Sequence, residues 1–189
     1  MQQTQADRIA ALVERYGRMV YVTAYRILGN AEDADDALQE VFLRLLRRSR
    51  DRGGSEDVRD WGAYLKLVAT RCAVDVLRGR SNRRTENLEA TDLVGFDDVD
   101  PSRLASQRQK ADMLRKALSL MPERDAQVFA LRCFDDLSYE MIATQMSLSV
   151  SQVGVILHRT RVRLRQMWEP QTGTAIPRYE RGEQDVGAS

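Results

Sequence analysis

The chain has 189 residues, enough for one domain or two small ones, and 6% aromatic residues with only 4 prolines suit a helical protein. Its 29 Lys and Arg residues nearly balance 28 Asp and Glu residues, so the net charge of +1 carries no information about nucleic-acid binding. The sequence has no secretory-signal core, no run long enough to span a membrane, and two cysteines, Cys72 and Cys133, without metal-ligand spacing. We therefore expect a cytoplasmic protein with no membrane insertion, metal site or disulfide framework.

The first predicted element is an amphipathic helix over residues 5–28, where apolar residues recur at three- and four-residue steps. Gly29 ends this helix, and Asn30 can cap a second one that runs to about Arg48. The polar residues 49–57 predict a loop. A third helix is predicted from about Val58 to Arg78, and Gly79 is expected to close the first domain.

A polar segment without helical period follows, and it predicts a linker before helices resume near Leu104. Two helices are then expected over residues 104–121 and 123–134. Ser138 can cap a short helix over residues 139–146, and after a tight turn a longer helix begins with the capping-box pair Ser149 and Gln152. A short helix, a turn and a longer helix form the helix-turn-helix pattern.

These elements predict an all-α fold of two small helical domains joined by a flexible polar linker. The predicted boundaries are a first domain over residues 1–84, an acidic linker over 85–103, a second domain over 104–169, and a disordered tail over 170–189. The charged residues follow the same division into a domain and a linker. Residues 44–84 are rich in Arg, whereas the charged residues among 85–100 are all Asp or Glu. Such blocks mark either binding surfaces or ordinary solvated helix faces.

The longer helix of the helix-turn-helix predicts DNA binding. Its inward face is expected to hold Val153, Leu157, Thr160 and Leu164, which leaves a polar face free for the major groove. Gln can pair with adenine and Val can contact a thymine methyl, while Arg residues bind phosphate. An ordinary helical hairpin with a basic end is the alternative. The candidate DNA-contacting residues are Ser149, Ser151, Gln152, Val155, His158, Arg159 and Arg161.

Catalytic chemistry has no visible support in the sequence. His158 is the only histidine, and no Gly-rich phosphate loop or nucleophile elbow is present. The acids Glu32, Asp33, Asp35 and Asp36 surround the start of a helix and do not share one face, which favours capping or protein docking over metal binding. We expect no enzymatic activity and no cofactor.

Three stretches resemble extracytoplasmic-function sigma factors of the sigma-70 family, in the right order and with the right tether. The first is NAEDADDALQEVFLRLL, at residues 30–46, which is similar to the polymerase-binding stretch of that family. The second is WGAYLKLVATRCAVDVLRGR, at residues 61–80, which resembles its promoter-melting helix. The third is MPERDAQVFALRCFDDLSYEMIATQMSLS, at residues 121–149, followed by HRTRVRLR, which resembles its C-terminal helix-turn-helix.

The resemblance implies a protein that binds core RNA polymerase and promoter DNA, together with a restraining anti-sigma factor. By position, the implied contacts with the polymerase clamp helices are Asp33, Asp36, Gln39 and Glu40. The implied residues for the −10 element, with the loop at residues 49–57, are Trp61, Tyr64, Arg71, Arg78, Arg80, Arg83 and Arg84. Aromatic surfaces for unstacked bases and positive charge along the strand suit that role. The helix-turn-helix residues would read the −35 element.

The sequence departs from the family pattern at a few positions. Arg71 stands where many relatives have Asn, and Gly154, Val155 and Ile156 replace a Lys-Ser-Arg run of the recognition helix. Ser147 stands at a turn position that is often Gly. The −35 preference of relatives therefore does not transfer to this chain. A helix-turn-helix regulator acting without polymerase, or a helical protein-binding adaptor, remains the alternative function.

Overall fold

A computed structural model describes residues 5–52, 58–86 and 101–172, and all of its regular elements in these ranges are helices. Their bounds, in chain order, are α1 (Gln5–Leu28), α2 (Ala31–Arg52), α3 (Trp61–Glu86), α4 (Pro101–Leu120), α5 (Glu123–Cys133), α6 (Tyr139–Met146) and α7 (Val150–Thr172). The predicted all-α fold with two helical domains is confirmed. The predicted linker core at residues 87–100 and the predicted tail beyond residue 172 lie outside the described residues.

Helices α1 and α2 form a hairpin whose turn follows from local sequence. Gly29 has a φ of 68°, a left-handed conformation that glycine adopts at no steric cost, and its N–H donates to the Tyr25 carbonyl at 2.7 Å. The Asn30 side chain accepts from the Asp33 N–H at 3.0 Å and so caps α2, as predicted. Val20, Ala24 and Ile27 of α1 then face the interior.

The predicted ends of α2 and α3 are wrong. Helix α2 continues through residues 49–52, which were predicted to be loop, because no residue there breaks a helix; the rest of the predicted loop, residues 53–57, lies outside the described residues. Helix α3 begins at Trp61, where the Asp60 carboxylate accepts from the Ala63 N–H at 3.0 Å. It also passes through Gly79 to Glu86, because one glycine in a helix costs only about 1 kcal/mol.

Helices α4 to α7 form the second domain. Helix α4 begins at Pro101, inside the predicted linker, and proline suits a first helical position because it needs no hydrogen-bond acceptor there. Helix α6 has the predicted bounds, and the Ser138 hydroxyl caps it by accepting from the Met141 N–H at 3.2 Å. Helix α7 ends at Thr172, a few residues into the segment predicted to be a disordered tail.

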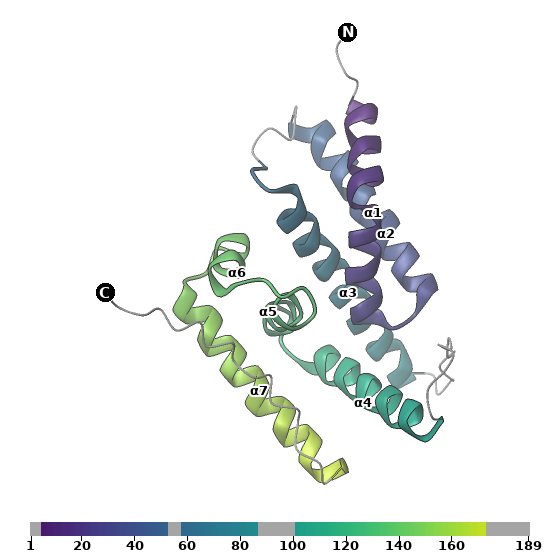
Figure 1. Cartoon of the computed structure of the whole chain (residues 1–189), viewed down its shortest axis with the longest axis vertical. Coiled ribbons are helices and arrows are strands. Elements are labelled where there is room, and N and C mark those ends of the chain that lie inside the picture. The colour runs from purple at the N-terminus through teal and green to yellow at the C-terminus, as the bar shows by residue number, and fades with distance from the viewer. Residues whose placement is uncertain (1–4, 53–57, 87–100, 173–189) are drawn as a thin grey trace.

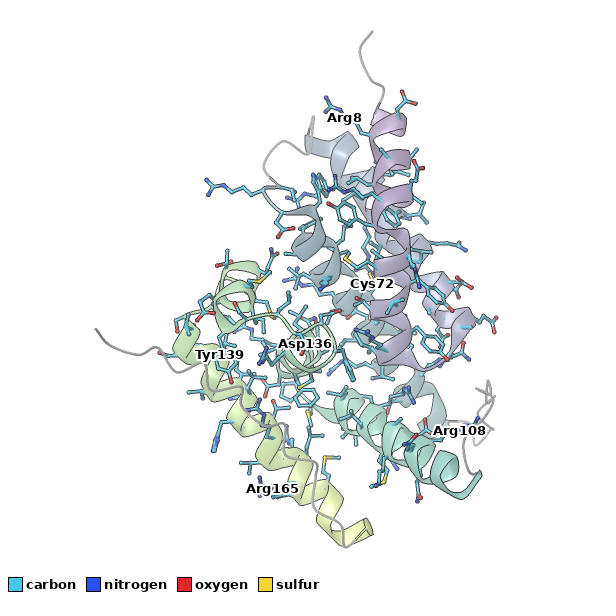
Figure 2. All side chains as sticks on the ribbon, in the orientation of Figure 1. Arg8, Cys72, Arg108, Asp136, Tyr139 and Arg165 are labelled. Atoms are coloured by element: carbon cyan, nitrogen blue, oxygen red, sulfur yellow. The ribbon has the colours of Figure 1, made fainter. Side chains whose placement is uncertain are left out.

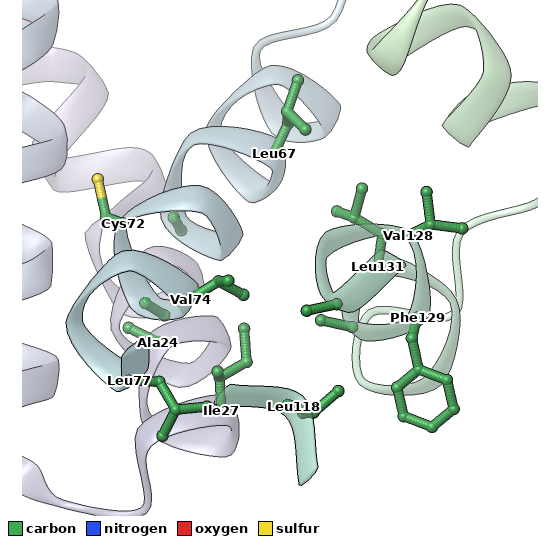
Figure 3. Packing of buried hydrophobic residues seen from close by; sticks show 14 of the residues in the cluster. Ala24, Ile27, Leu67, Cys72, Val74, Leu77, Leu118, Val128, Phe129 and Leu131 are labelled. Carbon is green, nitrogen blue, oxygen red and sulfur yellow. The ribbon is translucent and has the colours of Figure 1, made fainter. Parts of the chain in front are cut away.

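The two domains lie against each other (Figure 1). Helix α3 contacts α4, α5 and α6, and the buried apolar residues of both domains form one continuous cluster. Figure 3 shows Ile27, Val74 and Leu77 of the first domain facing Leu118 and Leu131 of the second. The sequence predicted a tether between the domains and gave no sign of this packing.

Candidate nucleic-acid interface

The turn between α6 and α7 is held by backbone and side-chain bonds from both helices. Ser147 has a left-handed φ of 54° at the end of α6, and the Leu148 N–H donates to the Ala143 carbonyl at 2.9 Å. At the start of α7, the Ser149 hydroxyl accepts from the Gln152 N–H at 3.1 Å, while the Ser149 N–H donates to Gln152 Oε1 at 2.8 Å. The predicted capping box is therefore present.

Helix α7 divides into an inward and an outward face as its periodicity predicts. Val153, Leu157, Thr160 and Leu164 are buried against α5 and α6. The outward face exposes Ser151, Val155, His158 and Arg161, and Arg165 projects from the same helix (Figure 2). Val155 is 62% exposed, which leaves an apolar side chain uncovered in the middle of this face. Ile156, by contrast, is buried, so it is unavailable to a ligand.

Arg159 is tied to the first turn of α5. Its Nε and Nη2 donate to the two carboxylate oxygens of Asp125 at 2.9 and 2.6 Å, a bidentate pair. The carboxylate is nearly buried while the Arg159 side chain stays more than half exposed. The pair fixes the guanidinium at the edge of the outward face. Asp125 was not among the predicted site residues, because no local spacing links it to Arg159.

The predicted −10 aromatics come together at the start of α3. Trp61 and Tyr64 meet edge to face with ring centroids 5.9 Å apart. Arg48 of α2 lies over the Tyr64 ring, and its Nη1 donates to the Tyr64 hydroxyl at 2.8 Å. Arg48 is therefore part of this aromatic and cationic cluster, although it was not among the residues predicted for the −10 element. Such a cluster has the chemistry that stacked bases require.

The basic residues of α3 do not share one face. Arg71 is exposed, whereas Arg78 donates to the Met121 carbonyl of the second domain. Arg80 forms an ion pair with Asp33 of α2, which joins a predicted DNA residue to a predicted polymerase residue. Arg83 and Arg84 lie in the last turns of α3, and their side chains are outside the described residues.

Two of the predicted polymerase-binding residues are exposed, and the other two are held in ion pairs. Asp36 and Gln39 are exposed on one face of α2, since they are three residues apart on a helix. Leu43, one further turn along this face, is 44% exposed. Glu40 accepts from Arg44 at 2.7 Å and lies 3.7 Å from Arg47. Asp33, which precedes Asp36 by one turn, is instead paired with Arg80.

Neither a metal site nor a reactive thiol emerges in the described part of the chain. No group of His, Cys, Asp and Glu side chains there could hold a metal ion. Burial raises the pKa of Cys72 to about 11 and raises that of Cys133, so both thiols stay protonated and unreactive at neutral pH. None of the described helices is both long and apolar enough to cross a membrane.

The helix-turn-helix with an open polar face, beside a helical bundle with an aromatic and basic edge, defines a class of two-domain helical DNA-binding proteins. Comparison with known families identifies the class more closely. The family described as Sigma-70 region 2 matches residues 12–83, and the family described as Sigma-70, region 4 matches residues 111–164. The chain belongs to the extracytoplasmic-function group of the sigma-70 family, a family of non-enzymatic transcription regulators.

Curated relatives cover most of the chain. The extracytoplasmic-function RNA polymerase sigma factor SigE of Mycolicibacterium smegmatis is 30% identical over 156 residues, which span 82% of this chain and 59% of that protein. SigW of Bacillus subtilis is 26% identical over 169 residues, which span 85% of this chain and 88% of that protein. The chain therefore spans little more than half the length of the first relative and nearly all of the second.

A solved structure shows the same fold. The sigma factor RpoE of Bartonella quintana, in a complex with the anti-sigma factor NepR, superposes with a TM-score of 0.52. The match covers 86% of this chain and 97% of that one at 15% sequence identity. It extends over both helical domains, as the sequence resemblance implied.

Proposed function

We propose that this protein binds core RNA polymerase and directs it to promoters that carry −10 and −35 elements. The observation that carries the proposal is the outward face of α7, a capped recognition helix with exposed polar, apolar and basic side chains. A helix-turn-helix of this kind reads the major groove through the first turns of its second helix. The polymerase requirement is supported by the match of the first domain to Sigma-70 region 2.

At the −35 element, the first turns of α7 would lie against base edges. Ser151 and Val155 are exposed and one turn apart, so one can hydrogen-bond a base edge while the other contacts a thymine methyl. Ser149 and Gln152 keep their capping roles, which occupy the Gln152 carbonyl and leave its amide nitrogen for a base or phosphate. Arg159 and Arg161, on the following turns, would bind phosphate.

At the −10 element, the start of α3 would hold unpaired bases. Trp61 and Tyr64 meet edge to face, and the Arg48 guanidinium lies over the Tyr64 ring, so the cluster would offer a base both aromatic and cationic surface. Opening the duplex becomes favourable where displaced bases find such surfaces, since base–aromatic stacking is worth about 1–3 kcal/mol per base. Arg71 is exposed farther along the same helix and would follow the strand.

Core RNA polymerase would bind the outer face of α2. Asp36 and Gln39 are free to meet a basic helical surface, and Leu43 extends their face with an apolar anchor. Asp33 and Glu40 are committed to Arg80 and Arg44, so they would contribute only by exchanging partners. We therefore rank Asp36 and Gln39 above the other two predicted residues.

Further parts of the proposal concern organisation and partners. We propose functional domains over residues 1–84 and 104–169, joined by the acidic linker over 85–103 and followed by a separate tail from residue 170. The protein would act in the cytoplasm, and an anti-sigma factor would restrain it. The solved relative RpoE, a complex with its anti-sigma factor, supports the last point by analogy.

The test is transcription from a promoter library by core RNA polymerase with the purified protein. We expect new start sites that depend on both components. The variant Asp36→Arg with Gln39→Ala should lose polymerase binding in a pull-down, whereas Glu14→Arg, the same charge reversal on an exposed site of α1, should keep it. Binding of the free protein to a palindromic site, with no new transcript, would instead indicate a conventional helix-turn-helix regulator.

A further inference from the structure

Arg159, at the edge of the outward face of α7, is held in place before any ligand binds. Its Nε and Nη2 donate to the two carboxylate oxygens of Asp125 at 2.9 and 2.6 Å, which fixes the plane of the guanidinium. Arg161 and Arg163 follow on the same helix and are exposed, and they make no hydrogen bond or ion pair with the described residues. Arg159 therefore differs from these neighbours in its order and not in its charge.

The bidentate pair leaves part of the Arg159 guanidinium free. An arginine carries five N–H donors in one plane, and the pair with Asp125 uses a donor on Nε and a donor on Nη2. The remaining donors, on Nη1 and Nη2, lie along the edge of the guanidinium that the carboxylate does not cover. The Arg159 side chain is 57% exposed, so solvent can reach this edge. Such a fork of donors matches two oxygens of a phosphate group.

The position of the Asp125 carboxylate is set by α5 and not by α7. Asp125 lies in the first turn of α5, where its N–H donates to the Pro122 carbonyl at 2.9 Å, and its side chain is 5% exposed. Helices α5 and α7 pack against each other (Figure 1). The carboxylate is therefore presented by a packed neighbouring helix and orients the arginine from the side.

An acid beside a phosphate-binding arginine has two opposite effects on binding. Its negative charge repels phosphate, whereas its hydrogen bonds restrict an arginine side chain that would otherwise lose rotational freedom when it binds. The repulsion is reduced, because the dipole of α5 offsets part of a negative charge in its first turn and salt screens the remainder over about 10 Å. These reductions leave the ordering of Arg159 as the larger effect.

We propose that Asp125 is a positioning residue for DNA binding, which holds Arg159 so that the free edge of its guanidinium meets a backbone phosphate. The inference rests on the proposed function for placing α7 against DNA, and it adds a residue of α5 that does not touch the DNA itself. It also predicts the sign of an effect. Removing an acid near DNA ordinarily strengthens binding by reducing repulsion, whereas removing the charge of Asp125 should weaken it.

The test compares two charge removals in the first turn of α5. Asp125→Asn keeps the side-chain shape and ends the bidentate pair, whereas Glu123→Gln is the matched control, because Glu123 is an exposed acid of the same turn. Fluorescence anisotropy of a labelled DNA duplex of mixed sequence measures binding to the 189-residue chain, since phosphate contacts carry no sequence information. We expect the dissociation constant to rise roughly two- to tenfold in Asp125→Asn and to stay unchanged or fall in Glu123→Gln.

A double-variant cycle separates positioning from a purely structural role. Arg159→Ala alone should raise the dissociation constant and reduce the slope of log affinity against log salt concentration by about 0.9, the value of one phosphate contact. In that background Asp125→Asn has no guanidinium to position, so it should no longer raise the dissociation constant. A loss that persists without Arg159 would show that the substitution distorts α5, and it would overturn the proposal. An Arg159→Ala variant that binds the duplex normally would overturn it as well.

A measurement on the unaltered chain covers the case in which Asp125→Asn does not fold. Nuclear magnetic resonance of the chain with isotopically labelled arginine detects the Arg159 Nε–H, which is identified by its absence from the spectrum of Arg159→Lys. We expect this N–H to exchange slowly with water both in the free protein and in the presence of the duplex. Rapid exchange in the free protein, or loss of protection when the duplex binds, would contradict a preformed and retained pair.

These outcomes are distinct from those of the transcription test. The duplex requires neither polymerase nor a promoter, so the expected binding results without new transcripts would contradict the proposed function alone. An unchanged or lower dissociation constant in folded Asp125→Asn would instead overturn the role of Asp125, whatever the transcription result.

Discussion

Arg159 is bonded to Asp125, so we predict that it stabilises the fold as well as being available to bind phosphate. The Asp125 carboxylate is 5% exposed, and both of its oxygens are occupied by Arg159. Arg159→Ala would leave that carboxylate nearly buried and without its cation. Asp125→Ala would leave a guanidinium that water can still reach, because the Arg159 side chain is 57% exposed.

The expected magnitude follows from this asymmetry. Breaking a fully buried ion pair from one side costs about 3–5 kcal/mol. Here the exposed arginine and the position of Asp125 in the first turn of α5, where the helix dipole favours an acid, reduce that figure. We expect Arg159→Ala to lower the free energy of unfolding by about 1–3 kcal/mol. The double variant with Asp125→Ala should lose less than the sum of the two single variants.

Urea unfolding of the 189-residue chain, followed by far-ultraviolet circular dichroism, measures these differences. Arg163→Ala is the matched control, since Arg163 is exposed on the same helix and should change the free energy of unfolding by no more than about 0.5 kcal/mol. Equal effects of Arg159→Ala and Arg163→Ala, or strict additivity in the double variant, would refute the reasoning.

Three further predictions concern α7, the turn before it and the buried Asp135. Gly154→Ala should raise the free energy of unfolding by about 1 kcal/mol, because alanine favours the helical conformation more than glycine does. The added Cβ has room, since its nearest neighbour, Tyr139 Cε2, would lie at an ordinary 3.9 Å. A lower melting temperature would contradict this. Ser147→Gly should stabilise by up to about 1 kcal/mol, because its φ of 54° is left-handed, and urea unfolding with an unchanged helix content tests it. Burial raises the pKa of Asp135 above its ordinary value of 3.8, because desolvation outweighs the hydrogen bond from Thr23 and the nearby charges of Lys66 and Arg26. The folded state therefore binds a proton at Asp135 more readily than the unfolded state, so the contribution of this group to the free energy of unfolding is largest below its ordinary pKa and declines as the pH rises through the raised pKa. Urea unfolding at a series of pH values tests this, and Asp135→Asn should weaken the dependence; an unchanged profile in that variant would assign the effect to other groups.

Local signals in the sequence were sufficient for the helices and their caps. The bounds of α1 and α6, the Asn30 and Ser138 caps and the capping box of α7 were all predicted, because each depends on residues within one turn of one another. The ends of α2 and α3 were not, since a polar stretch and a lone glycine are compatible with either helix or loop. Neither feature ends a helix by itself, since residues 49–52 contain no helix breaker and one glycine costs only about 1 kcal/mol.

The packing of the domains could not be predicted for a different reason. Thr23 and Asp135 are 112 residues apart, and each looks like a surface residue by composition. Both residues are buried because the two domains pack against each other at this contact. Likewise the outward face of α7 followed from spacing, whereas the partner of Arg159 did not, because a salt bridge between α5 and α7 leaves no periodic trace.

The internal bonds of the predicted DNA-binding arginines show which half of the site is preassembled. Arg159 holds Asp125 with Nε and Nη2, so its Nη1 is left to donate to a phosphate without breaking the pair. Arg78 must instead leave the Met121 carbonyl, and a charge-assisted bond to phosphate is stronger than the bond to a neutral carbonyl that it replaces. Arg80 exchanges similarly, since polymerase binding to Asp33 would release it. We therefore expect the proposed −35 surface to need no rearrangement of Arg159, whereas the proposed −10 surface requires Arg78 and Arg80 to exchange partners.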